Sequence, residues 1–143
     1  MACFVAGGEY RGTYSMFGLF KKQESSARKG LRLEFERVTA MLRGADDLSQ
    51  MSVGHVINMM NSMFIKRFRT VDEFQLLPKS VKMDYIHSLS SMEEKMASED
   101  PFSALGVGLF KMWIGTVVEN DEALMSQFFN ELSYFSRKGD HFS

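Results

Sequence analysis

The sequence predicts an all-α fold, a compact single-domain bundle of five to six helices with an apolar helix at its centre. Three observations support this prediction. Apolar residues recur every three or four positions over most of the chain, which places them on one face of a helix. Residues that favour helix starts stand before most of these apolar runs. No alternating pattern is long enough to predict a strand. The length of 143 residues suits one domain.

The first two helices are predicted over residues 25–43 and from about Ser49 or Ser52 to Phe68. Gly44 is expected to end the first of them in the left-handed conformation that glycine tolerates. Four apolar side chains of the first helix share one face: Leu31, Phe35, Val38 and Leu42. The second helix is apolar around most of its circumference, so we expect it to be well buried. Its main stripe consists of Val53, Val56, Ile57, Met60, Phe64 and Phe68.

A short helical turn and a further helix are predicted after residue 69. Thr70 and Glu73 have the spacing of a capping box, so a short turn is expected from there to Leu77. Pro78 interrupts it, because proline disfavours helix at the residue before it. Pro78 also suits the first position of the next helix, which is predicted to run to about Ala97.

Asp100 and Pro101 form the clearest helix start in the chain and open an apolar helix over residues 101–118. This helix is shorter than a typical membrane span and contains three glycines, so we interpret it as a buried core helix. Glycine lowers helix propensity by about 1 kcal/mol relative to alanine. We therefore expect another helix to approach closely at Gly106 and Gly115.

The last helix is predicted from Asp121, which caps it, to Arg137. Gly139 is expected to end it. Residues 24–138 are accordingly predicted to form the helical domain and residues 139–143 a tail.

Residues 1–23 show no clear period and are predicted to be an irregular segment. Met16 begins a short apolar stretch followed by charge, as at a natural protein start, so we hypothesise that residues 1–15 are an extension. Glycines and charged residues occupy positions 7–11, where the apolar stretch of a secretory signal would run. No secretory signal is therefore predicted.

The net charge of −1 is unevenly distributed, since residues 1–43 carry eight Lys or Arg and four Asp or Glu. This excess is far below that of a dedicated nucleic-acid-binding protein, and an ordinary solvated surface explains it. Cys3 is the only cysteine and cannot form an internal disulfide or a thiolate metal site. We predict a cytoplasmic location, because a reducing compartment suits this composition.

No motif of a known enzyme chemistry is present. Asp84 and His87 share a helix face, but helical di-iron sites need a repeated Glu-x-x-His and two further carboxylates. We expect a surface Asp84 and a half-buried His87, and we expect His55 to be buried, neutral and hydrogen-bonded. The sequence thus predicts no catalytic residue, cofactor or metal site. An enzyme that uses scattered acids with His55 or His87 is the third-ranked hypothesis.

Residues 64–69 interleave aromatic and basic side chains, as single-stranded nucleic-acid sites do. However, Phe64 and Phe68 are four residues apart on the core stripe, so a core with a basic helix end is the simpler interpretation. Nucleic-acid binding is not predicted. Lys66, Arg67 and Arg69 are candidates for a basic contact with a partner.

The chain contains 12 Met and 13 Phe, its most unusual feature. Methionine adapts to irregular or varied partners, although core packing explains most of these residues. Several of them have no evident core position, which indicates surplus apolar surface. From this group we predict partner contacts at Phe17, Phe20, Met51, Phe74 and Met83.

The first function hypothesis is a non-enzymatic protein-interaction module, such as an adaptor, a toxin-neutralising protein or a regulator. It would bind a protein partner or a second copy of itself through a Met- and Phe-rich apolar surface. The alternative hypothesis is a helical domain that binds a small molecule or lipid in an interior apolar pocket.

Overall fold

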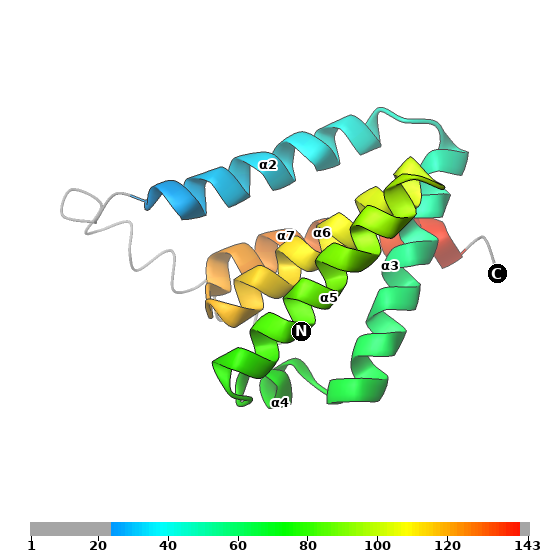
Figure 1. Ribbon diagram of the computed structural model, residues 1–143. Coiled ribbons are helices and arrows are strands. Elements are labelled where there is room, and N and C mark those ends of the chain that lie inside the picture. Colours follow the sequence, from blue (N-terminus) through cyan, green and yellow to red (C-terminus); the bar gives the residue numbers. More distant parts are fainter. Residues whose placement is uncertain (1–23, 141–143) are drawn as a thin grey trace.

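The computed structural model describes residues 24–140, and these residues are helical apart from short connections. The predicted all-α, compact helical fold is confirmed. The described residues form six helices (Figure 1): α2 (Ser26–Arg43), α3 (Asp47–Phe68), α4 (Val71–Gln75), α5 (Lys79–Ala97), α6 (Pro101–Val118) and α7 (Glu122–Asp140).

Side-chain caps begin most of the helices, at the positions that the sequence indicates. Ser25 caps α2 and Thr70 caps α4, where the amide of Glu73 donates to the Thr70 hydroxyl over 3.1 Å. Asp100 accepts from two amides at the start of α6, and Asp121 accepts from Leu124 at the start of α7. Each cap satisfies a backbone donor that the first helical turn leaves unpaired. These predicted starts are therefore confirmed.

Two predicted boundaries shift. The helix predicted from Ser49 or Ser52 starts earlier, at Asp47, because the Asp46 carboxylate accepts from the Ser49 amide over 2.8 Å. Gly44 ends α2 as predicted, but with φ −86° it lies in the right-handed region, so the expectation of a left-handed glycine is wrong. Its N–H donates to the Ala40 and Met41 carbonyls and tightens the last turn.

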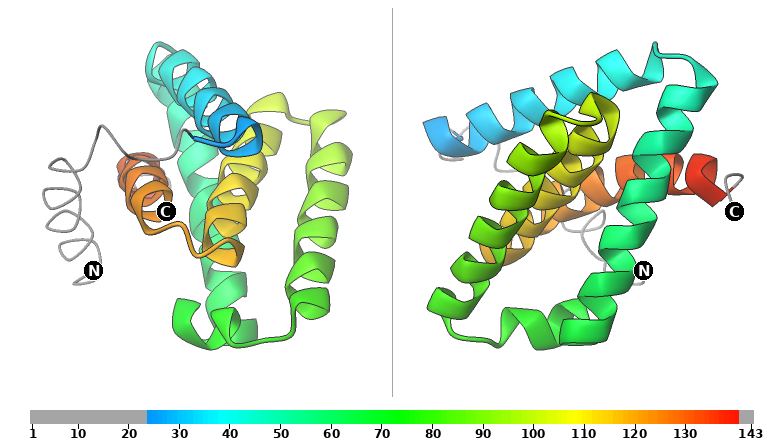
Figure 2. Two further views of the ribbon diagram at one scale, coloured as in Figure 1. Left: turned by 90° about the vertical axis from the view of Figure 1, so that its left-hand side faces the viewer. Right: turned by 45° about the vertical axis from the view of Figure 1, so that its right-hand side comes forward.

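Helix α6 is the central element of the bundle. It packs against α5, α3 and α7 and lies between α5 and α7 (Figure 2). By length and composition Pro101–Val118 could cross a membrane, yet in the fold more than half of it is buried by neighbouring helices. Its buried residues are Ala104, Gly106, Val107, Gly108, Leu109, Phe110, Trp113, Ile114, Thr116 and Val117. The interpretation of this segment as a core helix is confirmed.

Helices α3 and α7 form the most extensive pair and cross with their backbones in close contact. Gly54 of α3 faces Gly139 of α7, and a Cβ added at Gly54 would lie 2.6 Å from the Gly139 nitrogen. Only glycine leaves room for this approach. Gly139 is buried inside α7, which continues to Asp140, so the expectation that Gly139 ends the helix is wrong.

Only one of the two close approaches predicted along α6 occurs. At Gly106 an added Cβ would lie 3.0 Å from the Val53 carbonyl oxygen and 3.2 Å from Val56 Cβ, so α3 packs directly on this glycine. At Gly115 nothing lies within 4 Å, and the expectation for that position is wrong. Gly115 is half-buried.

Helix α2 lies across the other helices and packs less extensively on α3, α6 and α7 than these three pack on one another. Phe35 stacks on Phe128 of α7, with ring centroids 3.6 Å apart and an interplanar angle of 6°. At the start of α2, Arg28 contacts both Glu24 and Asp121, with its Nε 2.6 Å from an Asp121 oxygen. These ion pairs hold the beginning of α2 on the α6–α7 loop.

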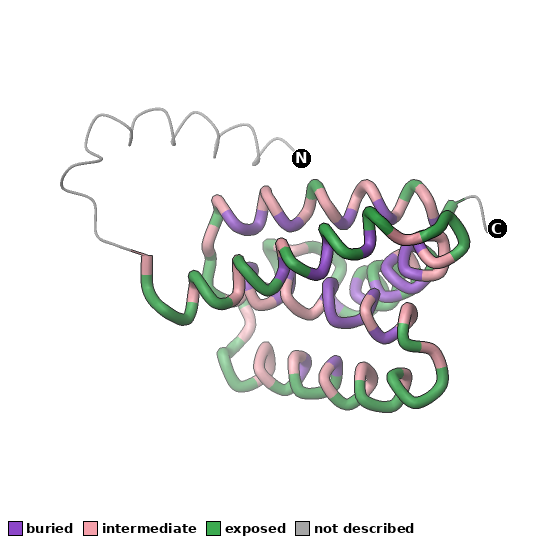
Figure 3. Tube along the Cα trace, turned by 90° about the horizontal axis from the view of Figure 1, so that it is seen from above, coloured by how far each residue is buried: buried purple, intermediate pink, exposed green. Residues whose placement is uncertain are grey.

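Buried residues follow the inner faces of the helices, while the outer faces are exposed (Figure 3).

Candidate functional site

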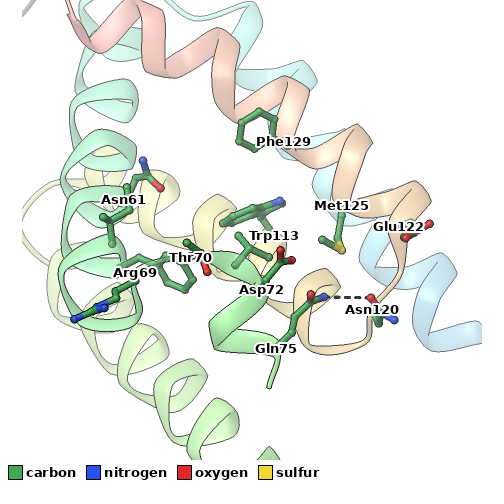
Figure 4. A pocket seen from close by; sticks show the side chains of 13 residues that line it. Asn61, Arg69, Thr70, Asp72, Gln75, Trp113, Asn120, Glu122, Met125 and Phe129 are labelled. Carbon is green, nitrogen blue, oxygen red and sulfur yellow. Dashed lines mark hydrogen bonds between the residues drawn. The ribbon is translucent and has the colours of Figure 1, made fainter. Parts of the chain in front are cut away.

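A cleft of about 460 Å³ opens where the end of α3, helix α4, the end of α6 and the first half of α7 meet (Figure 4). Its walls come from segments that are far apart in the sequence. The lining residues are Asn61, Phe64, Ile65, Arg69, Thr70, Val71, Asp72, Gln75, Trp113, Asn120, Glu122, Met125 and Phe129.

The base of the cleft is apolar and largely aromatic. The Phe64 ring lies 6.4 Å from the Trp113 ring in an edge-on arrangement, and the Phe129 ring lies 6.0 Å from it. Phe64 is 2% exposed and Met125 9% exposed, so both belong to the hydrophobic core as well as to the cleft. Rings at these separations form stable tilted and edge-on pairs. The cleft thus rests on a well-packed base.

The indole N–H of Trp113 has no hydrogen-bond partner among the described residues. Trp113 is 5% exposed, and its Nε1 is one of two buried polar side-chain atoms of this kind, the other being the Tyr85 hydroxyl. A buried donor left unpaired costs about 1–3 kcal/mol. The Trp113 Nε1 atom is fully buried, so this unpaired donor lies beneath the surface of the cleft.

A second, smaller hollow continues from the cleft between α3 and α7. Its volume is about 100 Å³, and it shares Asn61, Trp113 and Phe129 with the cleft. The side chains of Asn58, Ser133 and Ser136 add polar groups to its wall. Trp113 therefore stands at the junction of both hollows.

The edge of the cleft between α3 and α4 is strained. Arg69 has φ 73° and ψ −62°, and the Thr70 amide donates to the Phe68 carbonyl over 2.9 Å, which closes a tight γ-turn. A residue other than glycine in such a conformation costs about 1–3 kcal/mol, and such strain is concentrated at functional sites. Asn120, with φ 54°, also has a positive φ, but it follows α6 as an ordinary left-handed helix end.

Polar side chains surround the mouth of the cleft. Gln75 donates over 3.2 Å to both the Val117 carbonyl and the Asn120 side chain, so it holds α4 against the end of α6. The Asp72 carboxylate is directed toward Trp113, whereas the Arg69 guanidinium points away from the cleft (Figure 4). Within residues 24–140 Asp72 forms no ion pair. An unpaired carboxylate therefore faces the cleft.

The predicted partner-contact residues do not gather in one place. Phe74 is 0% exposed and contacts the rings of Phe64, Phe68 and Tyr85, so its prediction as a surface contact is wrong. It occupies the core because the turn at Arg69 folds α4 back onto α3. Met51 and Met83 are half-buried, and Phe17 and Phe20 lie outside the described residues. For these four the partner contact remains a prediction.

The three basic candidates at the end of α3 are exposed. Arg67 lies over the Phe68 ring at 4.9 Å and over the Tyr85 ring at 5.6 Å, so part of this side chain covers the aromatic core. Phe68 itself is 8% exposed, as the core interpretation expects. A basic contact of Lys66, Arg67 and Arg69 with a partner remains a prediction.

The histidines occupy other positions than expected. His55 is exposed, so its prediction as a buried residue is wrong: it lies on the outer side of α3, beside the face that packs on α7. His87 is exposed, so its prediction as a half-buried residue is wrong, whereas Asp84 is exposed as predicted. Between residues 24 and 140 no three His, Cys, Asp or Glu residues are close enough to hold a metal ion.

Of the residues that line the cleft, only Arg69 was among the predicted contact residues. Asn61, Asp72 and Trp113 come from three helices, and their proximity depends on how α3 and α4 pack on α6. The one available signal is that Trp113 is the single tryptophan of the chain and stands on its most apolar helix. A buried indole N–H in such a helix needs an acceptor.

The chain matches no protein-family model, no curated protein and no solved structure.

Proposed function

We propose that this chain is a helical small-molecule-binding domain and that the cleft between α3, α4 and α7 holds its ligand. The observation that carries the proposal is a cleft of about 460 Å³ with an apolar, aromatic base and polar side chains around its mouth.

The shape and chemistry of the cleft support a small organic ligand. Ligand pockets have volumes of roughly 300–1,000 Å³, with mostly apolar walls and a few placed polar groups. The aromatic base and the polar mouth have this pattern.

Blocking the cleft tests the proposal. Asn61 lines both hollows and is exposed, so Asn61→Phe should fill the cleft without disturbing the core. Asn130→Phe is the matched control, since Asn130 is exposed on α7 and lines neither hollow. Native mass spectrometry of the purified chain, followed by a thermal-shift screen of small molecules, should find ligands that bind wild type and Asn130→Phe but not Asn61→Phe. Ligands that bind all three equally would contradict the assignment of the cleft.

A protein-interaction module is the second candidate function. It is favoured by large apolar side chains on the surface: Leu33, Met41, Leu48, Met59, Met63, Ile65 and Leu76. Leu76 is 85% and Leu48 68% exposed. Size-exclusion chromatography with light scattering tests self-association, and a hydrophobic dye tests accessible apolar surface. A monomer that does not bind the dye would contradict this candidate.

We also propose that the protein is cytoplasmic. This proposal rests on the single Cys3, because proteins of a reducing compartment seldom contain disulfides. Fractionation of the source cells tests it, and recovery of the chain outside the cytoplasm would overturn it.

A further inference from the structure

We infer that the outer face of α3 is the docking surface for a second copy of this chain, whose own α3 lies on it antiparallel. Helix α3 runs along one side of the bundle, and its inner side packs on α6 and α7 (Figure 1). The outer face is separate from the proposed ligand site, because none of its residues lines the cleft. The failure of either proposal therefore leaves the other standing.

The α3 outer face presents apolar side chains at helical spacing. Met51, Met59 and Met63 are four or eight residues apart, which places them on one side of the helix. Leu48 at the beginning of this face is 68% exposed, and Met63 near its end is 47% exposed. The residues of the face are all half-buried or exposed: Leu48, Met51, Ser52, His55, Met59, Ser62, Met63 and Lys66.

The α3 outer face lacks charged side chains over most of its length. Residues 48–65 contain no Asp, Glu, Lys or Arg, a stretch of about 27 Å along the helix. Charge returns at the edge toward α7, where Asn58 donates to the Asp140 carboxylate over 3.2 Å. Interfaces have this composition, with few charges and more Met at the centre and a polar rim. An ordinary solvated face is charged, as on α5, which exposes Lys79, Asp84, Glu94 and Lys95.

Opposite charges at the two ends of α3 identify the occupant. Asp46 and Asp47 stand at its beginning, and Lys66 and Arg67 at its end. Lys138 of α7 lies 3.3 Å from Asp47 but leaves that side chain 84% exposed. Among the described residues Lys66 and Arg67 form no ion pair. An antiparallel copy brings the acidic end of each α3 to the basic end of the other, whereas a parallel copy would bring like charges together.

The α3 outer face is also self-complementary, as a two-fold interface must be. An axis level with Ile57 places Met51 of one copy level with Met63 of the other. Asp47 of each copy is then level with Arg67 of the other. Apolar residues thus meet on either side of the axis, and opposite charges meet at both ends.

Concentration-dependent sedimentation velocity of the full chain measures the association. One pair of helices forms an interface at the small end of the specific range, and such interfaces are usually transient. We expect a dimer with a dissociation constant on the order of 10 μM. A chain that stays monomeric at concentrations about tenfold higher would overturn the inference.

Met59→Glu tests the docking surface. Met59 lies two residues from Ile57, so each dimer would hold two glutamates near its axis within an apolar contact. Dimerisation should weaken by about tenfold or more. Leu33→Glu is the matched control, because Leu33 is 47% exposed in the first half of α2. Dimerisation that is equally strong in Met59→Glu and in the control would overturn the inference.

Charge reversal at the ends tests the antiparallel arrangement. Asp47→Lys and Lys66→Glu should each weaken dimerisation by about two- to tenfold, because like charges then meet at both ends of the dimer. An equimolar mixture of the two variants should recover the wild-type affinity, since opposite charges meet again in the mixed dimer. Glu94→Lys and Lys79→Glu on α5 make the same changes in net charge and should leave dimerisation unchanged.

These reversals concern exposed side chains and leave the apolar part of the face intact, so they decide the inference even if Met59→Glu does not fold. Recovery in the mixture supports the antiparallel second copy. Reversed variants that dimerise as tightly as wild type, or a mixture that associates no better than its components, would overturn it.

Discussion

The crossing of α3 and α7 gives the sharpest prediction about stability. Replacing Gly54 by alanine would place a Cβ against the Phe135 carbonyl oxygen, 2.6 Å from the Gly139 nitrogen and 2.9 Å from the Gly139 Cα. All three neighbours are backbone atoms of α7, which cannot move aside as a side chain does. The two helices must therefore separate along their contact.

The expected cost follows from this geometry. Inserting one methyl group into a close-packed interior destabilises a protein by about 1–3 kcal/mol, and the contacts here favour the upper end. Alanine recovers about 1 kcal/mol of helix propensity relative to glycine. We therefore expect Gly54→Ala to lower the free energy of unfolding by about 2 kcal/mol. At roughly 4 °C per kcal/mol for a chain of this size, Tm should fall by about 8 °C.

Urea and thermal denaturation, followed by circular dichroism, measure this change. Gly115→Ala is the matched control, because the same substitution on α6 meets no atom within 4 Å. The control should raise stability by up to about 1 kcal/mol through helix propensity alone. If Gly54→Ala is as stable as wild type, or gains stability as the control does, α3 and α7 do not cross as described.

Three further predictions concern buried and charged groups. The Tyr85 hydroxyl is buried without a hydrogen-bond partner among the described residues, and its burial raises the pKa of Tyr85 to about 12. Tyr85→Phe removes this hydroxyl, so the free energy of unfolding measured by urea titration should rise by about 1 kcal/mol. A lower free energy of unfolding would show that the hydroxyl has a partner. Arg69→Gly should raise Tm by a few degrees, because glycine relieves the positive φ, and a lower Tm would refute the strain. Hydrogen bonds from Arg32 and Arg28 lower the pKa of Glu24 from 4.5 to about 2. The stabilisation by this lowered pKa is complete above about pH 4.5 and is lost as the pH falls toward 2. In urea titrations Glu24→Gln should therefore lose less stability than wild type between about pH 5 and pH 3, and an equal loss would contradict the ion pairs.

Local signals predicted the helix starts well. Ser25, Thr70, Asp100 and Asp121 each cap a helix as predicted, because a cap depends on a side chain and an amide two or three residues away. The apolar stripes also predicted which faces are buried, since helical periodicity is local. The burial of residues 101–118 was predicted from their composition together with their length and glycine content, since a helix that is apolar on most sides is either a core helix or a membrane span.

Features that depend on tertiary packing were not predictable from the sequence. Gly139 has the position of a helix end, but its packing against Gly54 keeps it inside α7. Phe74 has no stripe of its own and becomes a core residue only because the turn at Arg69 folds α4 back onto α3. The cleft at Trp113 likewise arises between helices, and no spacing along the chain encodes it. A binding site of this kind becomes visible only in three dimensions.

A high-resolution crystal structure of the full chain, purified from its source cells without unfolding, tests the central claim most directly. We predict electron density for a non-protein molecule in the cleft, in contact with the Met125 and Phe129 side chains that line it. A cleft that is closed by side chains, or that holds only ordered water, would contradict the claim.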